Sequence, residues 1–257
     1  MKELLKKILP YGFLEAYRYL KFNVLDGYAI KSYSQEGEDM VLYRIFEGCE
    51  SGFYVDIGAH HPKRFSNTYF FYKRGWCGIN IEPNSEAIKL FKKYRTNDIN
   101  IEFGVSDQAG KLTYFMFNEP ALNSFDKDLS EKRASSTNYY IVRQEKIKVN
   151  RLDAILAEYL PKRVSIDFMC IDAEGYDLNI LKSNDWELYR PKCLLVESLE
   201  SHLSNIVNYP IHQYLIGRDY DLFAKTFNTL FYMDVRRQEL TRRRNSCGLE
   251  TDSDGLK

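Results

Sequence analysis

Gly52-Phe-Tyr-Val-Asp-Ile-Gly-Ala59 and Cys77-Gly-Ile-Asn-Ile-Glu-Pro-Asn84 are the two segments that decide the fold. Residues 53–57 and 77–81 are short apolar runs, which is typical of buried parallel strands. A glycine turn follows the first run, and Glu82 stands at the carboxyl end of the second. A strand, a turn, a connecting helix and a second strand that ends in an acid predict one half of a nucleotide-binding sheet.

The spacing within this unit indicates what kind of nucleotide it binds. Glu82 follows Gly58 by 24 residues, close to the ~20 expected when a carboxylate binds the ribose hydroxyls of an adenosine. The turn continues as Ala59-His60-His61-Pro62, so it lacks the G-x-G-x-x-G pattern that lets backbone approach a pyrophosphate. An adenosine without a pyrophosphate, such as S-adenosylmethionine (SAM), is therefore the expected cofactor.

Composition narrows the class of protein. With 257 residues, 44% of them hydrophobic, the chain can bury one substantial α/β core. The formal net charge is zero, so no overall field attracts nucleic acid or an anionic membrane. The five cysteines have no C-x-x-C or zinc-ligand spacing, which favours a reducing, cytoplasmic location.

The rest of the chain supplies the other elements of the sheet. Helices are expected at residues 66–74 (with Ser66 as N-cap), 85–94, 151–160, 177–182 and 209–216, and strands at 99–103, 111–117, 166–171 and 193–197. Residues 220–225 and 229–235 predict two strands joined so closely at Phe227-Asn228 that they must form an antiparallel hairpin. Five parallel strands plus this C-terminal hairpin, with helices on both faces, is the α/β, Rossmann-like layout of class I methyltransferases.

Three segments flank or interrupt this expected methyltransferase domain, residues 33–235. Residues 1–32 predict an amphipathic helical appendage that packs on the domain or on a second subunit of a homodimer. Charges and Pro10 interrupt its apolar positions, so it is neither a signal peptide nor a membrane span, and an interfacial membrane helix is the alternative. Residues 118–150 predict a long polar loop that covers the acceptor, and residues 236–257 predict a polar, disordered tail.

Two pairs of polar residues are candidate cofactor contacts. Ser34 and Gln35 precede an amphipathic helix, where they either cap it or bind the amino-acid end of the cofactor. Ser106 and Asp107 follow the third strand, where they either bind the adenine amino group or form an ordinary turn.

A group of acids at the carboxyl ends of the fourth and fifth strands is the strongest catalytic pattern. Asp172 and Glu174 are two residues apart and are expected to point to the same side of the strand. Glu197 ends the next strand, and His202 follows it. Carboxylates this close must share a proton or a cation, or the pKa of one must rise. If they share a cation, Asp172, Glu197 and His202 are candidate ligands of Mg²⁺ or Mn²⁺. Capping of helix 177–182 is the structural alternative.

Taken together, the motifs resemble those of the FkbM-type SAM-dependent O-methyltransferases. The shared segments occupy positions 34–39, 55–59, 66–76, 81–84, 171–177 and 195–197. The resemblance implies SAM binding at Asp56, Gly58 and Glu82 and methyl transfer to a hydroxyl group, commonly of a sugar in a capsule, surface glycan or antibiotic. His60, His61 and Pro62 depart from the glycine-rich turn of many SAM sites.

A more distant similarity, to metal-dependent sugar O-methyltransferases of macrolide and coumarin pathways, bears on mechanism. Those enzymes carry acids after the fourth and fifth strands, in places comparable to Asp172, Glu174 and Glu197. The similarity implies a metal ion that binds two sugar oxygens and lowers the pKa of one, with Glu174 or a histidine as the base. Without a metal, His60 or His61 must act as the base.

The sequence thus predicts SAM-dependent methylation of a sugar hydroxyl. The expected acceptor is a nucleotide-activated hexose or heptose for a capsule or other surface polysaccharide, because the covering loop is polar, the chain has 20 tyrosines, and no large basic patch suits nucleic acid. The alternatives are an NAD-dependent oxidoreductase and an inactive methyltransferase-like binding module.

Overall fold

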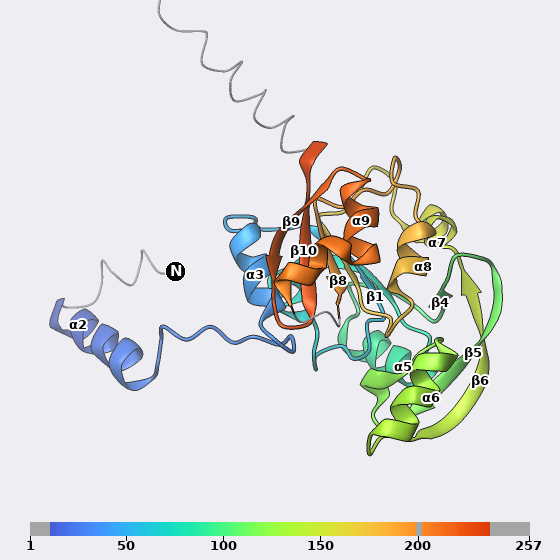
Figure 1. Ribbon diagram of the computed structural model, residues 1–257. Coiled ribbons are helices and arrows are strands. Elements are labelled where there is room, and N and C mark those ends of the chain that lie inside the picture. Colours follow the sequence, from blue (N-terminus) through green and yellow to red (C-terminus); the bar gives the residue numbers. More distant parts are fainter. Residues whose placement is uncertain (1–10, 199–201, 237–257) are drawn as a thin grey trace, which may run out of the picture. The chain divides into compact units, whose positions relative to one another are not determined.

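The computed structural model describes residues 11–198 and 202–236 (Figure 1). Residue contacts divide the chain into two units, with the boundary between Ser32 and Tyr33. In the first unit, helix α2 (Tyr11–Tyr19) continues into a π-helical turn, η1 (Leu20–Val24). The first ten residues of the predicted appendage and residues 237–257 of the predicted tail lie outside the described part. Within the described ranges, no helix has the length and apolar character needed to cross a bilayer.

The second unit is built on a seven-stranded sheet with the order β3-β2-β1-β7-β8-β10-β9. The strands are β1 (Phe53–Ile57), β2 (Cys77–Ile81), β3 (Ile99–Ile101), β7 (Phe168–Ile171), β8 (Cys193–Glu197), β9 (Tyr220–Lys225) and β10 (Thr229–Asp234). The five strands from β3 to β8 are parallel. Strand β10 is antiparallel to both β8 and β9. The predicted class I methyltransferase layout, including the hairpin, is confirmed.

Helices cover both faces of this sheet because successive strand residues point to opposite sides. Tyr54 and Phe168 pack in one apolar cluster with Leu42 of α3 (Glu38–Ile45). Val55 and Met169, one position further along each strand, pack in the other. This second cluster contains the apolar sides of α7 (Leu152–Tyr159), α8 (Asp177–Lys182) and α9 (Pro210–Ile216). The same unit also contains helices α4 (Tyr69–Tyr72) and α5 (Ser85–Tyr94) and the short η3 (Leu203–Asn208).

A second, three-stranded sheet corrects the expectation of a long loop at residues 118–150. Its strand order is β4-β6-β5, with β4 at Gly104–Val105, β5 at Gly110–Phe117 and β6 at Ile141–Asn150. Between β5 and β6 the chain forms η2 (Pro120–Leu122) and helix α6 (Lys127–Ser136), which lie beside the small sheet in Figure 1. Most of β6 is exposed or only partly buried, so its sequence lacks a continuous apolar pattern.

Two further predicted elements have different bounds in the structure. The helix predicted at residues 66–74 contains only Tyr69–Tyr72, and Ser66 Oγ accepts a hydrogen bond from the Tyr69 amide at 3.1 Å just before it. The strand predicted at residues 99–103 ends at Ile101, and Gly104 and Val105 form the separate strand β4 because they pair with the end of β6. In both places long-range contacts replaced the locally preferred structure.

Candidate active site

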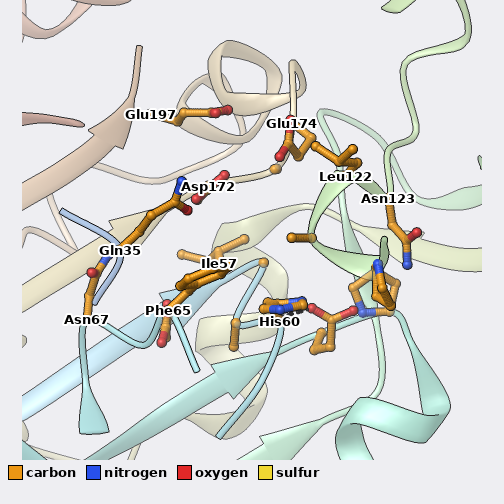
Figure 2. A pocket seen from close by; sticks show the side chains of 18 of the residues that line it. Gln35, Ile57, His60, Phe65, Asn67, Leu122, Asn123, Asp172, Glu174 and Glu197 are labelled. Carbon is orange, nitrogen blue, oxygen red and sulfur yellow. Dashed lines mark hydrogen bonds between the residues drawn. The ribbon is translucent and has the colours of Figure 1, made fainter. Parts of the chain in front are cut away.

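A cavity of about 430 Å³ opens at the carboxyl ends of the parallel strands (Figure 2), where open α/β sheets bind their ligands. Its volume falls in the usual range of about 300–1,000 Å³ for small-molecule sites. Of the residues named from the sequence, those that line it are Gln35, Asp56, Gly58, His60, Glu82, Asp172, Glu174 and Glu197. The cavity therefore combines both groups of candidate residues, those for the cofactor and those for catalysis.

Gly58 has a structural reason to be glycine that requires no ligand. Its backbone has φ +75°, a conformation that residues with side chains rarely adopt. A Cβ atom at this position would lie 1.8 Å from the Asp172 carbonyl oxygen. Gly58 thus lets the turn after β1 approach the chain after β7, which brings Asp172 next to the cofactor side of the cavity.

Asp56 and Glu82 present buried carboxyl groups to the cavity. Glu82 accepts hydrogen bonds from the amides of His60 (2.9 Å) and Asn84 (2.8 Å), and burial raises its pKa to about 7. Asp56 Oδ2 accepts from Thr68 Oγ1 at 3.0 Å, and burial raises its pKa to about 6. Each carboxyl group is oriented by protein donors and is costly to ionise without a compensating ligand.

Asp172, Glu174 and Glu197 form an acidic group in which each residue offers an oxygen within 4.8 Å of the others. In Figure 2 their side chains turn toward one another. Asp172 is accessible from the cavity yet enclosed by protein, and burial raises the pKa of all three carboxyl groups. Repulsion among them adds to this effect and brings the pKa of Glu197 to about 11. Arg133 of α6 opposes this rise at Glu174, whose Oε2 accepts from Nη2 at 2.7 Å, and to a smaller extent at Glu197.

The two histidines after Ala59 have different surroundings. His60 lines the cavity, and its buried Nε2 has no hydrogen-bond partner among the described residues. Burial, with a smaller contribution from Arg64, lowers its pKa to about 4, so it is neutral at pH 7. His61 Nδ1 instead accepts from the amides of Lys63 and Arg64 at 3.1 and 2.9 Å, and His61 is not among the cavity-lining residues.

Besides His61, the structure leaves four predicted site residues away from the cavity wall: Ser34, Ser106, Asp107 and His202. Ser34 Oγ bonds the Asp39 carboxylate and amide, so it stabilises the start of α3 and leaves Gln35 at the cavity. Ser106 donates to Asp107 and turns away from the cavity, because the preceding Val105 is the residue of β4 that faces it.

His202 corrects the predicted ligand set. It is exposed at the start of η3 and belongs neither to the acidic group nor to the cavity lining. The third member of the group is Glu174. Glu174 reaches Asp172 and Glu197 because it adopts φ 50° in the turn after β7, a conformation that the sequence does not specify.

Several cavity residues were missed because most of them come from loops, one comes from α6, and one is the first residue of β10. They are Arg64, Phe65, Asn67, Glu119, Asn123, Arg133, Asn228 and Thr229. His60, Phe65 and Glu174, all in the cavity wall, have positive φ values between 50° and 56°. Such backbone conformations are concentrated at functional sites. No sequence pattern marks them, although Asn228 could have been noted as a turn residue at a strand end.

Comparison with solved structures gives the following matches. The C-terminal domain of precorrin-6Y C5,15-methyltransferase from Rhodobacter capsulatus is 11% identical over 76% of this chain and 86% of its own, with a TM-score of 0.39. A protein from Klebsiella pneumoniae, provisionally assigned as an O-methyltransferase, is 11% identical over 91% of this chain and 95% of its own, with a TM-score of 0.38. No curated protein matches the chain.

The family comparison covers most of the chain. The model of the methyltransferase FkbM domain matches residues 56–230. The matched region begins at Asp56 in β1 and ends in β10, so it contains the whole central sheet except β1's first residues and the end of the hairpin. Methyltransferases of this kind use SAM as the methyl donor. The chain therefore belongs to the FkbM family of methyltransferases.

Proposed function

We propose that the protein transfers a methyl group from SAM to a hydroxyl group of a sugar, in the form of a nucleotide-activated hexose or heptose used for a surface polysaccharide. The observation that carries this proposal is that one cavity contains both the buried Asp56–Glu82 pair and the acidic group of Asp172, Glu174 and Glu197. The first pair suits a cofactor, and the second suits the activation of a hydroxyl group.

The charge of the cavity wall supports SAM as the cofactor. Eight carboxyl groups and two guanidinium groups line the cavity. SAM carries a sulfonium and an ammonium group, and both offset buried carboxylates. Glu82 lines the cavity with a carboxylate, the group that binds ribose hydroxyls in such sheets. Asp56 Oδ1 accepts no hydrogen bond from the described residues, so it can receive the ammonium group. A dinucleotide pyrophosphate would meet strong repulsion from the same wall, which argues against an NAD-dependent oxidoreductase.

The same charge restricts how the acceptor binds. An uncharged sugar ring can enter an acidic cavity, whereas the phosphates of a nucleotide-activated sugar must extend beyond it or meet a cation. Arg64 lies at the cavity, where its two terminal nitrogens donate to Glu119 at 2.9 and 3.1 Å. This places a guanidinium group, which can form paired bonds with phosphate oxygens, on the turn after β1.

Two mechanisms can activate the acceptor hydroxyl. In the first, Asp172 and Glu197 would hold Mg²⁺ or Mn²⁺, whose preference for oxygen ligands fits this donor set. Such an ion would supply acidity to a hydroxyl group, and Glu174, oriented by Arg133, would accept the proton. In the second, neutral His60 accepts the proton through its unpartnered Nε2, and Asp172 orients the sugar.

The proposal is tested by incubating the protein with SAM and a panel of nucleotide-activated sugars, with and without Mg²⁺ or Mn²⁺. Mass spectrometry should detect the gain of one methyl group by at least one sugar, together with S-adenosylhomocysteine. The matched control is Asp172→Asn. Methylation of a protein or nucleic acid, with every sugar unmodified, would contradict the proposed acceptor, and absence of all transfer with bound SAM would favour an inactive binding module.

A further inference from the structure

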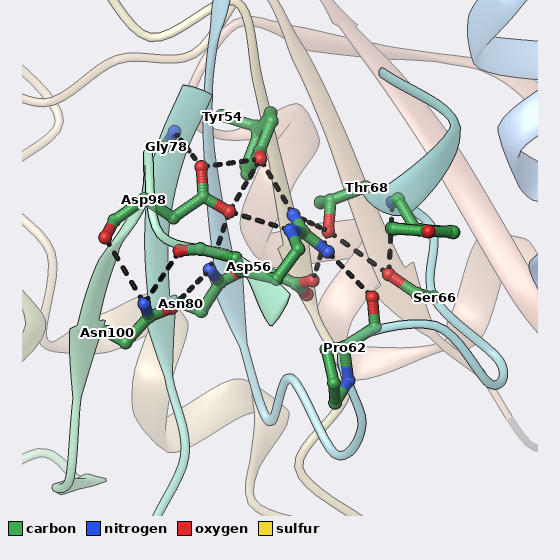
Figure 3. A network of polar contacts seen from close by, with 11 residues as sticks. Tyr54, Asp56, Pro62, Ser66, Thr68, Gly78, Asn80, Asp98 and Asn100 are labelled. Carbon is green, nitrogen blue, oxygen red and sulfur yellow. Dashed lines mark hydrogen bonds and ion pairs between the residues drawn. The ribbon is translucent and has the colours of Figure 1, made fainter. Parts of the chain in front are cut away.

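Arg95 is a fully buried cation that lies behind the cavity wall, at the end of α5. Four of its five N–H groups have protein acceptors (Figure 3). The acceptors are Asp98 Oδ2 at 2.8 Å, the Pro62 carbonyl at 3.1 Å, Tyr54 OH at 2.7 Å and Thr68 Oγ1 at 3.0 Å. One side chain thus connects the segment just after α5, which includes Asp98, to three residues that lie 27 to 41 positions away in the sequence.

These acceptors fall into two sets with different positions relative to the cavity. Tyr54 lies in β1 and Asp98 lies buried just before β3, where it also accepts from the Gly78 amide and from Asn80 of β2. None of these residues lines the cavity. Thr68 and Pro62 adjoin it, because Thr68 bonds Asp56 and because Pro62 ends the turn that carries His60.

The Thr68 hydroxyl transmits the position of Arg95 to Asp56. A guanidinium group only donates hydrogen bonds, so the Thr68 hydroxyl accepts from Arg95 and its own hydrogen is available to Asp56 Oδ2, 3.0 Å away. Successive hydrogen bonds of this kind strengthen one another in a buried environment. Asp56 is thus held through Oδ2, and its Oδ1 is left to bind a ligand.

Stability alone gives a weak reason for this arrangement. Burying an ion pair such as Arg95–Asp98, which is fully enclosed, carries a desolvation cost, and apolar residues of similar volume are often at least as stabilising. The planar guanidinium group of Arg95, in contrast, fixes several acceptors at once in a defined geometry.

We propose that Arg95 is a positioning residue of the cofactor site, acting through Thr68 on the Asp56 carboxylate and through the Pro62 carbonyl on the turn that carries His60. The inference rests on the proposed binding of SAM at Asp56. It adds a residue that touches neither cofactor nor acceptor but determines how tightly the cofactor is held.

The test compares two variants that each remove one buried hydroxyl group bonded to Arg95. Thr68→Val breaks the connection to Asp56, and Tyr54→Phe breaks a bond on the interior side. Isothermal titration with S-adenosylhomocysteine should show about tenfold weaker binding for Thr68→Val and a change of less than about threefold for Tyr54→Phe. Thr68→Ser, which keeps the hydroxyl group, should restore binding to within about threefold of wild type.

Thermal unfolding of all variants separates positioning from general destabilisation. If Arg95 is only structural, loss of affinity will follow loss of melting temperature, and the two hydroxyl deletions will weaken binding alike. That result, or wild-type affinity in Thr68→Val, would overturn the inference. If Thr68→Val does not fold, Thr68→Cys takes its place with the same expectation. Failure of the wild-type protein itself to bind would contradict the proposed function, and the inference would fall with it.

Discussion

Among single residues, Glu82 contributes both to the turn after β1 and to the proposed cofactor site. Its carboxylate holds the turn through the His60 and Asn84 amides, and the residue also lines the cavity. Glu82→Ala should weaken SAM binding at least about tenfold, because hydrogen bonds to a charged group contribute about 1.5–3 kcal/mol. Calorimetry measures this change, and unchanged affinity would place the adenosine elsewhere.

Glu82 should also give the ligand-free protein a specific pH dependence. Its pKa rises from 4.5 to about 7 on folding, so between these values the folded state binds more protons than the unfolded state. The free energy of unfolding therefore falls as pH rises through this window. Glu82→Gln cannot titrate, so from pH 4.5 to 7 wild type should lose up to about 3 kcal/mol relative to it. Urea titrations at several pH values test this, and a constant difference would contradict it.

Asp172 decides between the two mechanisms of hydroxyl activation. If the acidic group holds a divalent cation, chelation with EDTA should abolish turnover and added Mg²⁺ or Mn²⁺ should restore it. Asp172→Asn should then lose activity while it keeps SAM affinity, since its carboxylate belongs to the acceptor side. Full activity after exhaustive chelation would contradict the metal and leave His60 as the base to examine, with His60→Gln as the next variant.

At the scale of elements, α6 has few interior contacts and depends on Arg133. Ser130 is its only buried residue, whereas Arg133 bonds both Glu174 and the Leu122 carbonyl. Arg133→Gln should therefore raise hydrogen exchange of the α6 amides by about tenfold, with β7 and β8 unchanged. Arg143→Gln, which removes an exposed pairing with Glu145 on β6, is the matched control. Equal exchange in both variants would show that Arg133 does not hold α6.

The same elements show what the sequence could and could not predict. The buried strands and the hairpin were identifiable because apolar runs of four to six residues bounded by turns have few alternatives. Strand β6 and helix α6 were missed, since their stability comes from strand pairing and from contacts such as Arg133–Glu174. Helix α4 was predicted too long because local capping preference does not reveal where tertiary packing ends a helix.

At the scale of the whole molecule, residues placed directly at strand ends were predictable as cavity residues. Asp56, Glu82, Asp172 and Glu197 line the cavity because parallel strands end at one edge of the sheet. Residues further into the loops were not predictable, as Asp107 and His202 illustrate. Their distance from the cavity depends on loop conformation and on the second sheet, neither of which leaves a pattern in the sequence.

The proposed function depends on the binding of SAM in this cavity. Its most direct test is calorimetric titration of the wild-type protein with SAM, with NAD⁺ titrated under the same conditions. We expect a single site of micromolar affinity for SAM and no detectable binding of NAD⁺, because the acidic wall attracts the cationic cofactor and repels a pyrophosphate. Binding of NAD⁺, or no binding of SAM by folded protein, would contradict it.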